Sequence, residues 1–180
     1  MCLALVLPLA AQLGCQGPVS TVQFVSYKDA YFPETYRVQL PGCAYWIDAG
    51  HDIHIVGRAD QPDNDGKGPI RQYLHVCIYW KPHPGKTHAD SSTSDALLRY
   101  VVAGDNGVAV YTGTGFAFPK EQRGGRLEVD IESARLRLES LSGDLPDVLG
   151  DAHVTGKLIA DRNPGKAAQL IRESELLAAH

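Results

Sequence analysis

Histidine and carboxylate side chains are the first candidates for chemistry in this sequence, which contains seven histidines in 180 residues. Neutral imidazole and carboxylate groups are common ligands of zinc and related ions. The side chains that could ligate a metal are His51, Asp52, His54, His83 and His88. On a strand, His51 and His54 would point to opposite faces, whereas Asp52 and His54 would share one. The spacing matches no zinc motif, so we interpret these histidines as loop and sheet-surface residues, with a metal-dependent hydrolase as the alternative.

His75 and Cys77 form a second candidate pair, because a thiol beside a histidine base can act as a nucleophile. The two residues share one face of a predicted strand. Side chains two residues apart on a strand run parallel, and no third group is visible in the sequence to orient the imidazole. We therefore predict no catalytic residue and no cofactor.

Two Tyr-Trp pairs could line a platform for a sugar ring, because aromatic side chains combine a flat apolar body with a polar edge. These residues are Tyr45, Trp46, Tyr79 and Trp80. Trp80 is in phase with the apolar residues of its predicted strand, which favours packing in the core. A carbohydrate-binding module is the alternative function for this set.

Strands must position all of these side chains, because apolar and polar residues alternate along the chain from residue 20 onward. Such alternation is typical of half-buried β-strands. It predicts about eight strands, over residues 21–27, 36–40, 52–58, 70–80, 96–103, 108–118, 126–139 and 153–160. Strands without alternating helices predict a mainly β fold, either an antiparallel sandwich or a small barrel.

Two irregularities are expected in the longest strands. Apolar residues fall at odd positions up to Ile131 and at even positions from Ala134. A one-residue slip would turn the second half inside out, so we predict a β-bulge near residues 132–133 that restores the register. In the preceding strand, Gly113 and Gly115 indicate a point of bending or close packing.

The end of the chain predicts one C-terminal amphipathic helix. Asn163 is a favourable N-cap, and Pro164 suits the first helical position. The residues that follow place apolar side chains on one stripe, at Ala167, Leu170, Ile171 and Leu177, with Ser174 among them.

The N-terminus is apolar and uncharged, since the first charged residue is Lys28. Residues 2–11 are too few to span a hydrocarbon core of ~30 Å, which takes ~20 apolar residues. Their number does suit the apolar region of an export signal. The Leu-Gly-Cys tripeptide that ends at Cys15 resembles a bacterial lipobox, in which the cysteine is acylated and becomes the mature N-terminus. Gln12 departs from the pattern, which prefers Leu, Val or Ile, and no positively charged region precedes the apolar run.

This resemblance divides the chain into a signal peptide (1–14), a tether (15–20) and one β-rich domain (21–180). It implies an exported protein held at the bacterial cell envelope by lipid on Cys15, where each buried CH₂ group contributes ~0.8 kcal/mol. An ordinary signal peptide cut after Ala11 would instead give a soluble periplasmic or secreted protein.

The resemblance also bears on the remaining cysteines. With Cys2 removed and Cys15 acylated, Cys43 and Cys77 are the thiols left, and an oxidising compartment favours a disulfide between them. In the chain-entropy model this bond would stabilise the fold by ~3–4 kcal/mol. It requires Cys43 to lie on a strand near Cys77, or the second face of that strand to be covered.

Composition narrows the function further. The chain is 44% hydrophobic and 21% charged, with a net charge of -4, which excludes a disordered or polytopic membrane chain and a nucleic-acid binder. We expect a non-catalytic binding or structural role, with the membrane contacted through the lipid and a protein or glycan partner. A binding module should show an exposed patch or a cleft near residues 59–69 and 81–95. A member of a larger envelope complex should show an exposed apolar patch.

Overall fold

The computed structural model describes residues 19–29, 31–62, 68–79 and 95–179, which form nine strands and one helix. The strands are β1 (Ser20–Ser26), β2 (Glu34–Leu40), β3 (Cys43–Ile47), β4 (Ile53–Gln61), β5 (Ile70–Ile78), β6 (Ala96–Gly104), β7 (Gly107–Gln122), β8 (Arg126–Gly143) and β9 (Ala152–Arg162). The helix is α1 (Pro164–Ala178). The predictions for the signal peptide, Cys15, Trp80, His83 and His88 lie outside the described residues.

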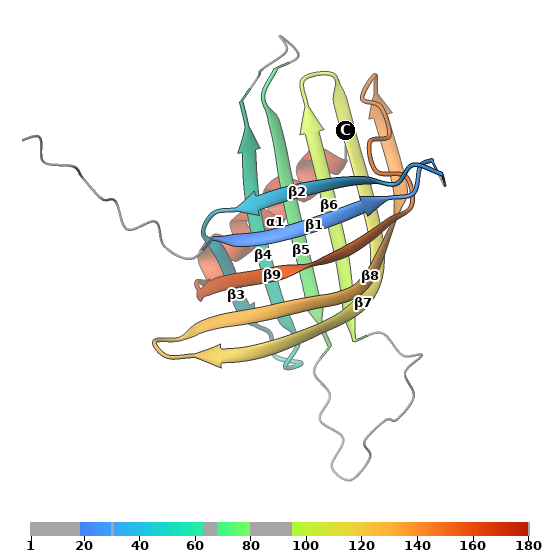
Figure 1. Ribbon diagram of the computed structural model, residues 1–180. Helices are drawn as coiled ribbons and strands as arrows, with labels where there is room; N and C mark the ends of the chain where they lie inside the picture. Colours follow the sequence, from blue (N-terminus) through green and yellow to red (C-terminus); the bar gives the residue numbers. More distant parts are fainter. Residues whose placement is uncertain (1–18, 30, 63–67, 80–94, 180) are drawn as a thin grey trace, which may run out of the picture.

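The nine strands form one sheet in the order β2-β1-β9-β3-β4-β5-β6-β7-β8, and β8 pairs again with β9. Seven strands, β3 to β9, therefore close into a ring, and β1 and β2 extend the sheet beside β9. The pairing of β3 with β9 is parallel and every other pairing is antiparallel. Figure 1 shows β2, β1 and β9 crossing in front of β4, β5 and β6, with α1 behind that second layer. The predicted mainly β fold with a C-terminal helix is confirmed.

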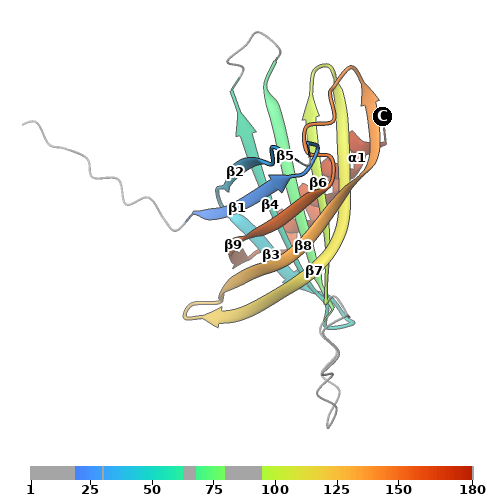
Figure 2. The same cartoon turned by 45° about the vertical axis from the view of Figure 1, so that its right-hand side comes forward.

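Strands β7 and β8 connect the two layers. The first part of β7 pairs with β6, and the rest, beyond Gly115, pairs with β8 alone. Figure 2 shows both long strands running from one layer into the other. The register of β8 against β9 shifts between Ile131 and Ala134, and Ser133 has a positive φ of 50°. The predicted β-bulge is confirmed, and it keeps the apolar residues on either side of it facing inward.

The glycines predicted to mark a bend lie opposite this bulge. A Cβ added at Gly113 would stand 1.7 Å from the carbonyl oxygen of Arg135, and one at Gly115 would stand 2.4 Å from Cβ of Ala134. Two backbones this close leave no room for a side chain. The bend of β7 over β8 therefore depends on glycine at both positions.

Apolar side chains fill the interior of the closed sheet. Its largest fully buried members include Phe24, Leu40, Ile55, Leu74 and Tyr111. The hydroxyl of Tyr111 donates to Asp147 at 2.8 Å and accepts from the backbone N–H of Val148 at 3.1 Å, which fixes the loop before β9. The buried Tyr100 donates to Gln72 in the same way, so these polar groups are paired inside the core.

Helix α1 covers the outer face of the second layer. The side chain of Asn163 accepts from the N–H of Lys166 at 3.0 Å, so the predicted N-cap is confirmed. Ala167 and Leu170 are buried with outward-facing residues of β3 to β7. The face that the strands turn away from the interior is thus apolar beneath the helix. No helix among the described residues is long and apolar enough to cross a membrane.

The alternation of apolar and polar residues did not predict strand β3. Its five residues, Cys43–Ile47, are largely apolar because both faces are covered. Cys43 and Tyr45 belong to the interior, whereas Ala44 and Trp46 pack with the residues beneath α1. A strand buried on both sides carries no alternating signal.

Candidate functional site

Three aromatic rings stack on the outer face of the sheet beside α1. Trp46 of β3 lies opposite His54 of β4, with ring centroids 4.1 Å apart and planes 10° from parallel. His75 of β5 continues the stack, with its centroid 5.5 Å from that of His54. Alternation directs all three side chains to the same face, and pairing of neighbouring strands sets them in a row.

A chain of polar contacts runs through this stack. Oδ2 of Asp48 lies 3.4 Å from Nε2 of His54, and Nδ1 of His54 lies 3.2 Å from Nε2 of His75. When both rings are neutral, His54 donates to the carboxylate and accepts from His75. We call Asp48, His54 and His75 the imidazole chain.

The turn between β3 and β4 holds the carboxylate at the start of the imidazole chain. Oδ1 of Asp48 accepts from the backbone N–H groups of Gly50 at 2.8 Å and Asp52 at 2.9 Å. The bond from the Asp52 N–H is the main cause that lowers the pKa of Asp48 below its usual value. The turn therefore presents an ionised carboxylate to His54.

The other end of the imidazole chain is kept uncharged. Burial lowers the pKa of His75 from 6.5 to about 4, with further lowering by His54 and by the positive charge of Arg99. Arg99 is the neighbour of His75 on β6, and its Nε atom is buried without a hydrogen-bond partner in the described part of the chain. His75 is therefore uncharged near neutral pH and is a poor proton acceptor.

Cys77 lies opposite His54 on the next strand, but its environment does not activate the thiol. Burial raises the pKa of Cys77, and the negative charges of Asp52 and Asp48 raise it further. A reactive cysteine needs the opposite, a pKa lowered by nearby positive charge. The structure therefore does not combine a reactive cysteine with a histidine base at this position.

The described candidates for metal ligands, His51, Asp52 and His54, do not form one site. His51 has a φ of +68°. It lines a pocket of about 360 Å³ together with Tyr45 and Ile53, and the end of β7 and the start of β8 form the other side of this pocket. His54 instead joins the outward-facing imidazole chain. Among the described residues, no group of three or more His, Cys, Asp or Glu side chains could hold a metal ion.

The described residues of the possible sugar platform do not share one face of the sheet. Tyr45 is only 6% exposed and donates its hydroxyl hydrogen to the carbonyl of Gly125 at 3.1 Å. Trp46 follows it on the strand and therefore takes the opposite face, against His54. Tyr79 is 48% exposed at the end of β5. Tyr45 packs in the core, as we preferred, and shares no surface with Trp46.

The predicted disulfide is absent, and both described cysteines are free. Cys43 is in the interior core, with its Sγ directed to the carbonyl of Leu40 at 3.6 Å. Cys77 has the parity of the outer face, and β4 separates its strand from β3. The two thiols thus lie on opposite faces of the sheet, which prevents a bond without rearrangement of the backbone.

The sequence did contain a signal for the imidazole chain. The strands with His54 and His75 are consecutive and joined by a polar loop, so they pair as an antiparallel hairpin. In that hairpin the outward-facing histidines lie on adjacent strands. Asp48 could not be found in this way, because the turn that carries it follows the unpredicted strand β3.

One surface pocket borders residues 59–61, at the start of one of the two loops expected to carry a ligand. This pocket of about 550 Å³ is bordered by the end of β4 at Ala59 and Gln61, by Val19, and by Arg37 of β2. A second pocket of about 410 Å³ lies on the outside of β8 and β9, beside Tyr27. Both volumes fall within the ~300–1,000 Å³ that small ligands occupy.

No protein-family model, curated protein or solved structure matches this chain. Its function must therefore be argued from its own residues.

Proposed function

We propose that the protein is exported and held at the bacterial cell envelope by lipid on Cys15, where its β domain has a binding role without catalysis. The observation that carries this proposal is the position of the fold relative to the lipobox-like tripeptide. The first strand begins at Ser20, five positions after Cys15. Processing at Cys15 would remove the apolar segment and leave every described residue in place.

The pocket beside Val19 supports the binding role. Its lining combines the apolar Val19, Val38 and Pro41 with the polar Arg37 and Asp60. Such a mixture suits a ligand with an apolar body and a polar group, and a few convergent polar groups are what fix the orientation of a ligand. The pocket also borders the loop that follows β4, where a binding module was expected to carry its ligand.

Metabolic labelling with a palmitate analogue in a bacterial host tests the anchor. We expect label on the wild-type protein and none on Cys15→Ala, because the thiol of Cys15 is the acceptor. Cys2→Ala is the matched control and should be labelled like the wild type. The N-terminus of the mature chain adds a second readout, since acylation gives a blocked Cys15 whereas an ordinary signal peptidase would leave Gln12. Background labelling of the wild type, or equal labelling of Cys15→Ala, would refute the proposal.

A further inference from the structure

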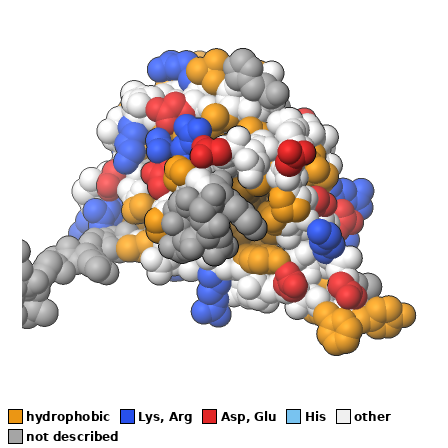
Figure 3. Space-filling model, turned by 90° about the horizontal axis from the view of Figure 1, so that it is seen from above, with side chains coloured by type: hydrophobic (Ala, Val, Ile, Leu, Met, Phe, Trp, Pro, Cys, Tyr) orange, Lys and Arg blue, Asp and Glu red, His pale blue; other side chains and the backbone are white. Residues whose placement is uncertain are grey.

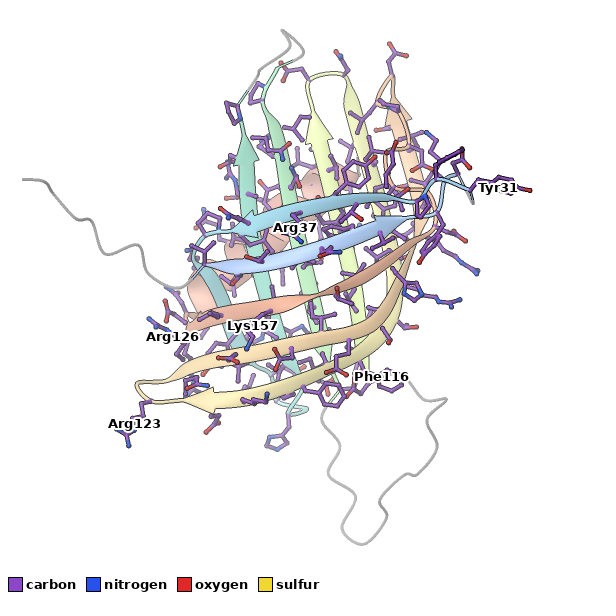
Figure 4. All side chains as sticks on the ribbon, viewed as in Figure 1. Tyr31, Arg37, Phe116, Arg123, Arg126 and Lys157 are labelled. Carbon is purple, nitrogen blue, oxygen red and sulfur yellow. The ribbon has the colours of Figure 1, made fainter. Side chains whose placement is uncertain are left out.

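The turn between β1 and β2 carries the two most exposed large hydrophobic side chains of the described residues. Tyr31 is 88% exposed and Phe32 is 75% exposed, and we call this pair the aromatic tip. In Figure 4, Tyr31 points away from the body of the molecule. Figure 3 shows hydrophobic side chains projecting from one corner of the surface. Burial of such a ring is worth ~1.5–3 kcal/mol, so the exposed rings favour contact with an apolar phase.

Hydrogen bonds hold the aromatic tip in one conformation. Oδ1 of Asp29 accepts from the N–H of Tyr31 at 2.9 Å, and its carbonyl accepts from the N–H of Phe32 at 3.3 Å. Below the turn, Nζ of Lys28 donates to the carbonyl of Asp147 at 2.7 Å, and Ser26 donates to that of Leu149 at 2.6 Å. These two bonds attach the base of the tip to the loop before β9. Its rings are preorganised, which lowers the entropic cost of binding.

The surroundings of the tip combine apolar rings with polar groups. Behind Phe32 lies a pocket of about 570 Å³ that is also lined by Tyr36, Val148, Lys28 and Glu34. Rings with one apolar and one polar end are enriched at the interface between lipid and water. A long basic side chain such as Lys28 keeps its charge in water while its carbons approach the apolar region. The rings and Lys28 suit a bilayer interface, whereas the carboxylates of Asp29, Glu34 and Asp147 in the same lining keep the pocket itself in water.

The size of the aromatic tip argues against a protein partner. A stable protein interface takes ~800 Å² from each partner. Two aromatic side chains bury ~150–250 Å² each. The tip alone therefore falls well short of a protein interface, whereas a bilayer accepts small protruding groups without a complementary surface.

We propose that Tyr31 and Phe32 insert into the interface of a lipid bilayer, as a second membrane contact beside the lipid on Cys15. The paired location rests on the proposed function. Five extended residues span at most ~18 Å from Cys15 to Ser20, and the seven residues of β1 add ~23 Å. Both ends of β1 can thus reach one bilayer face when the β1–β2 hairpin lies along it. A second contact suits such an anchor, because stable attachment generally takes two signals.

Fluorescence quenching by lipid tests the insertion. The full chain with Cys2→Ala is produced in bacteria, purified, and labelled with bimane at Phe32→Cys. Cys43 and Cys77 are buried, and the parent without Phe32→Cys measures any label on Cys15. Leu176→Cys is the matched control, because Leu176 is 65% exposed on α1, and Figure 1 shows α1 behind the sheet whereas β1 and β2 lie in front of it. In vesicles of phosphatidylethanolamine and phosphatidylglycerol with brominated acyl chains, we expect bimane at position 32 to lose most of its fluorescence and bimane at position 176 to keep it. Equal quenching at both positions, or quenching at neither, would overturn the inference.

Two further readouts separate this inference from its alternatives. Palmitate labelling of the same preparation reports the anchor, so a protein without label whose position 32 is still quenched refutes the anchor and supports the tip. If position 32 is shielded from iodide in native membranes but is not quenched by brominated lipid in vesicles, it contacts a protein partner. That result would overturn the inference. In the unacylated protein, Tyr31→Ser and Phe32→Ser should each weaken vesicle binding about tenfold.

Discussion

The bend of β7 over β8 and the aromatic tip between β1 and β2 differ in the space that surrounds their side-chain positions. At Gly113 and Gly115 the neighbouring backbone is so close that no side chain fits. At Tyr31 and Phe32 the rings are surrounded mainly by solvent. Close packing of the two backbones at the bend thus supports the closed ring of strands. In contrast, β1 and β2 extend from the ring and expose the rings of the aromatic tip to solvent. Mutations should separate the two regions by their effects on folding and on binding.

The largest loss of stability is expected for Gly115→Val at the bend. The new side chain would collide with Cα and Cβ of Ala134, each 2.4 Å from the position of its Cβ. Because the obstacle includes backbone, we expect the free energy of unfolding to fall by more than about 3 kcal/mol. Denaturant unfolding measures it. Gly165→Ala is the control, since its nearest neighbour is 3.8 Å away in the first turn of α1, and it should stabilise by up to about 1 kcal/mol. An unchanged midpoint for Gly115→Val would mean that the bend can open.

The next largest effect is expected where α1 packs on the sheet. Leu170 is buried in the cluster beneath the helix, so Leu170→Ala should lower the free energy of unfolding by about 3 kcal/mol. Leu176→Ala, on the exposed side of the same helix, should change it by less than about 0.5 kcal/mol. Thermal and denaturant unfolding of the pair compare them directly. Equal losses would show that the helix does not depend on this face.

A pH-dependent effect of intermediate size is expected for His75. Its pKa is lowered from 6.5 to about 4 by burial, so between these values the unfolded chain binds a proton that the folded protein does not. The free energy of unfolding therefore does not vary with pH through this group above about pH 6.5. As pH falls from about 6.5 to about 4, the free energy of unfolding decreases by at most about 3 kcal/mol. Stability of His75→Gln should therefore depend less on pH over this window.

The matched control for His75 is His51→Asn, at an exposed position whose positive φ asparagine tolerates. It should keep the wild-type dependence of unfolding free energy on pH. If His75→Gln also keeps it, the imidazole of His75 is hydrated in the folded protein and the stack does not exclude water.

The smallest effect on stability is expected at the tip. Replacing both Tyr31 and Phe32 with serine should change the free energy of unfolding by less than about 0.5 kcal/mol, because both rings are exposed. The backbone bonds to Asp29 remain in the variant. Denaturant unfolding checks this expectation alongside vesicle binding. A loss comparable to that of Leu170→Ala would show that the rings support the fold.

Features read from local patterns were predicted correctly. Alternation located eight of the nine strands, the change of parity at Ile131 located the bulge, and Asn163 with Pro164 located the helix start. Each depends on the conformation of a few neighbouring residues. The predicted disulfide was wrong instead, because it required knowledge of which strands are adjacent and which face of the sheet each cysteine occupies.

The sequence by itself determined the type of every element except β3, and the side of its strand to which each residue points, because side chains alternate with a period of two. Only the tertiary structure decided that β9 pairs with β1 and β3 along one edge and with β8 along the other, which closes the ring. It also decided that α1 covers only part of the outer face, which leaves His54 and His75 stacked on Trp46 at its edge. These arrangements join residues far apart in the chain, and local periodicity carries no information about such pairs.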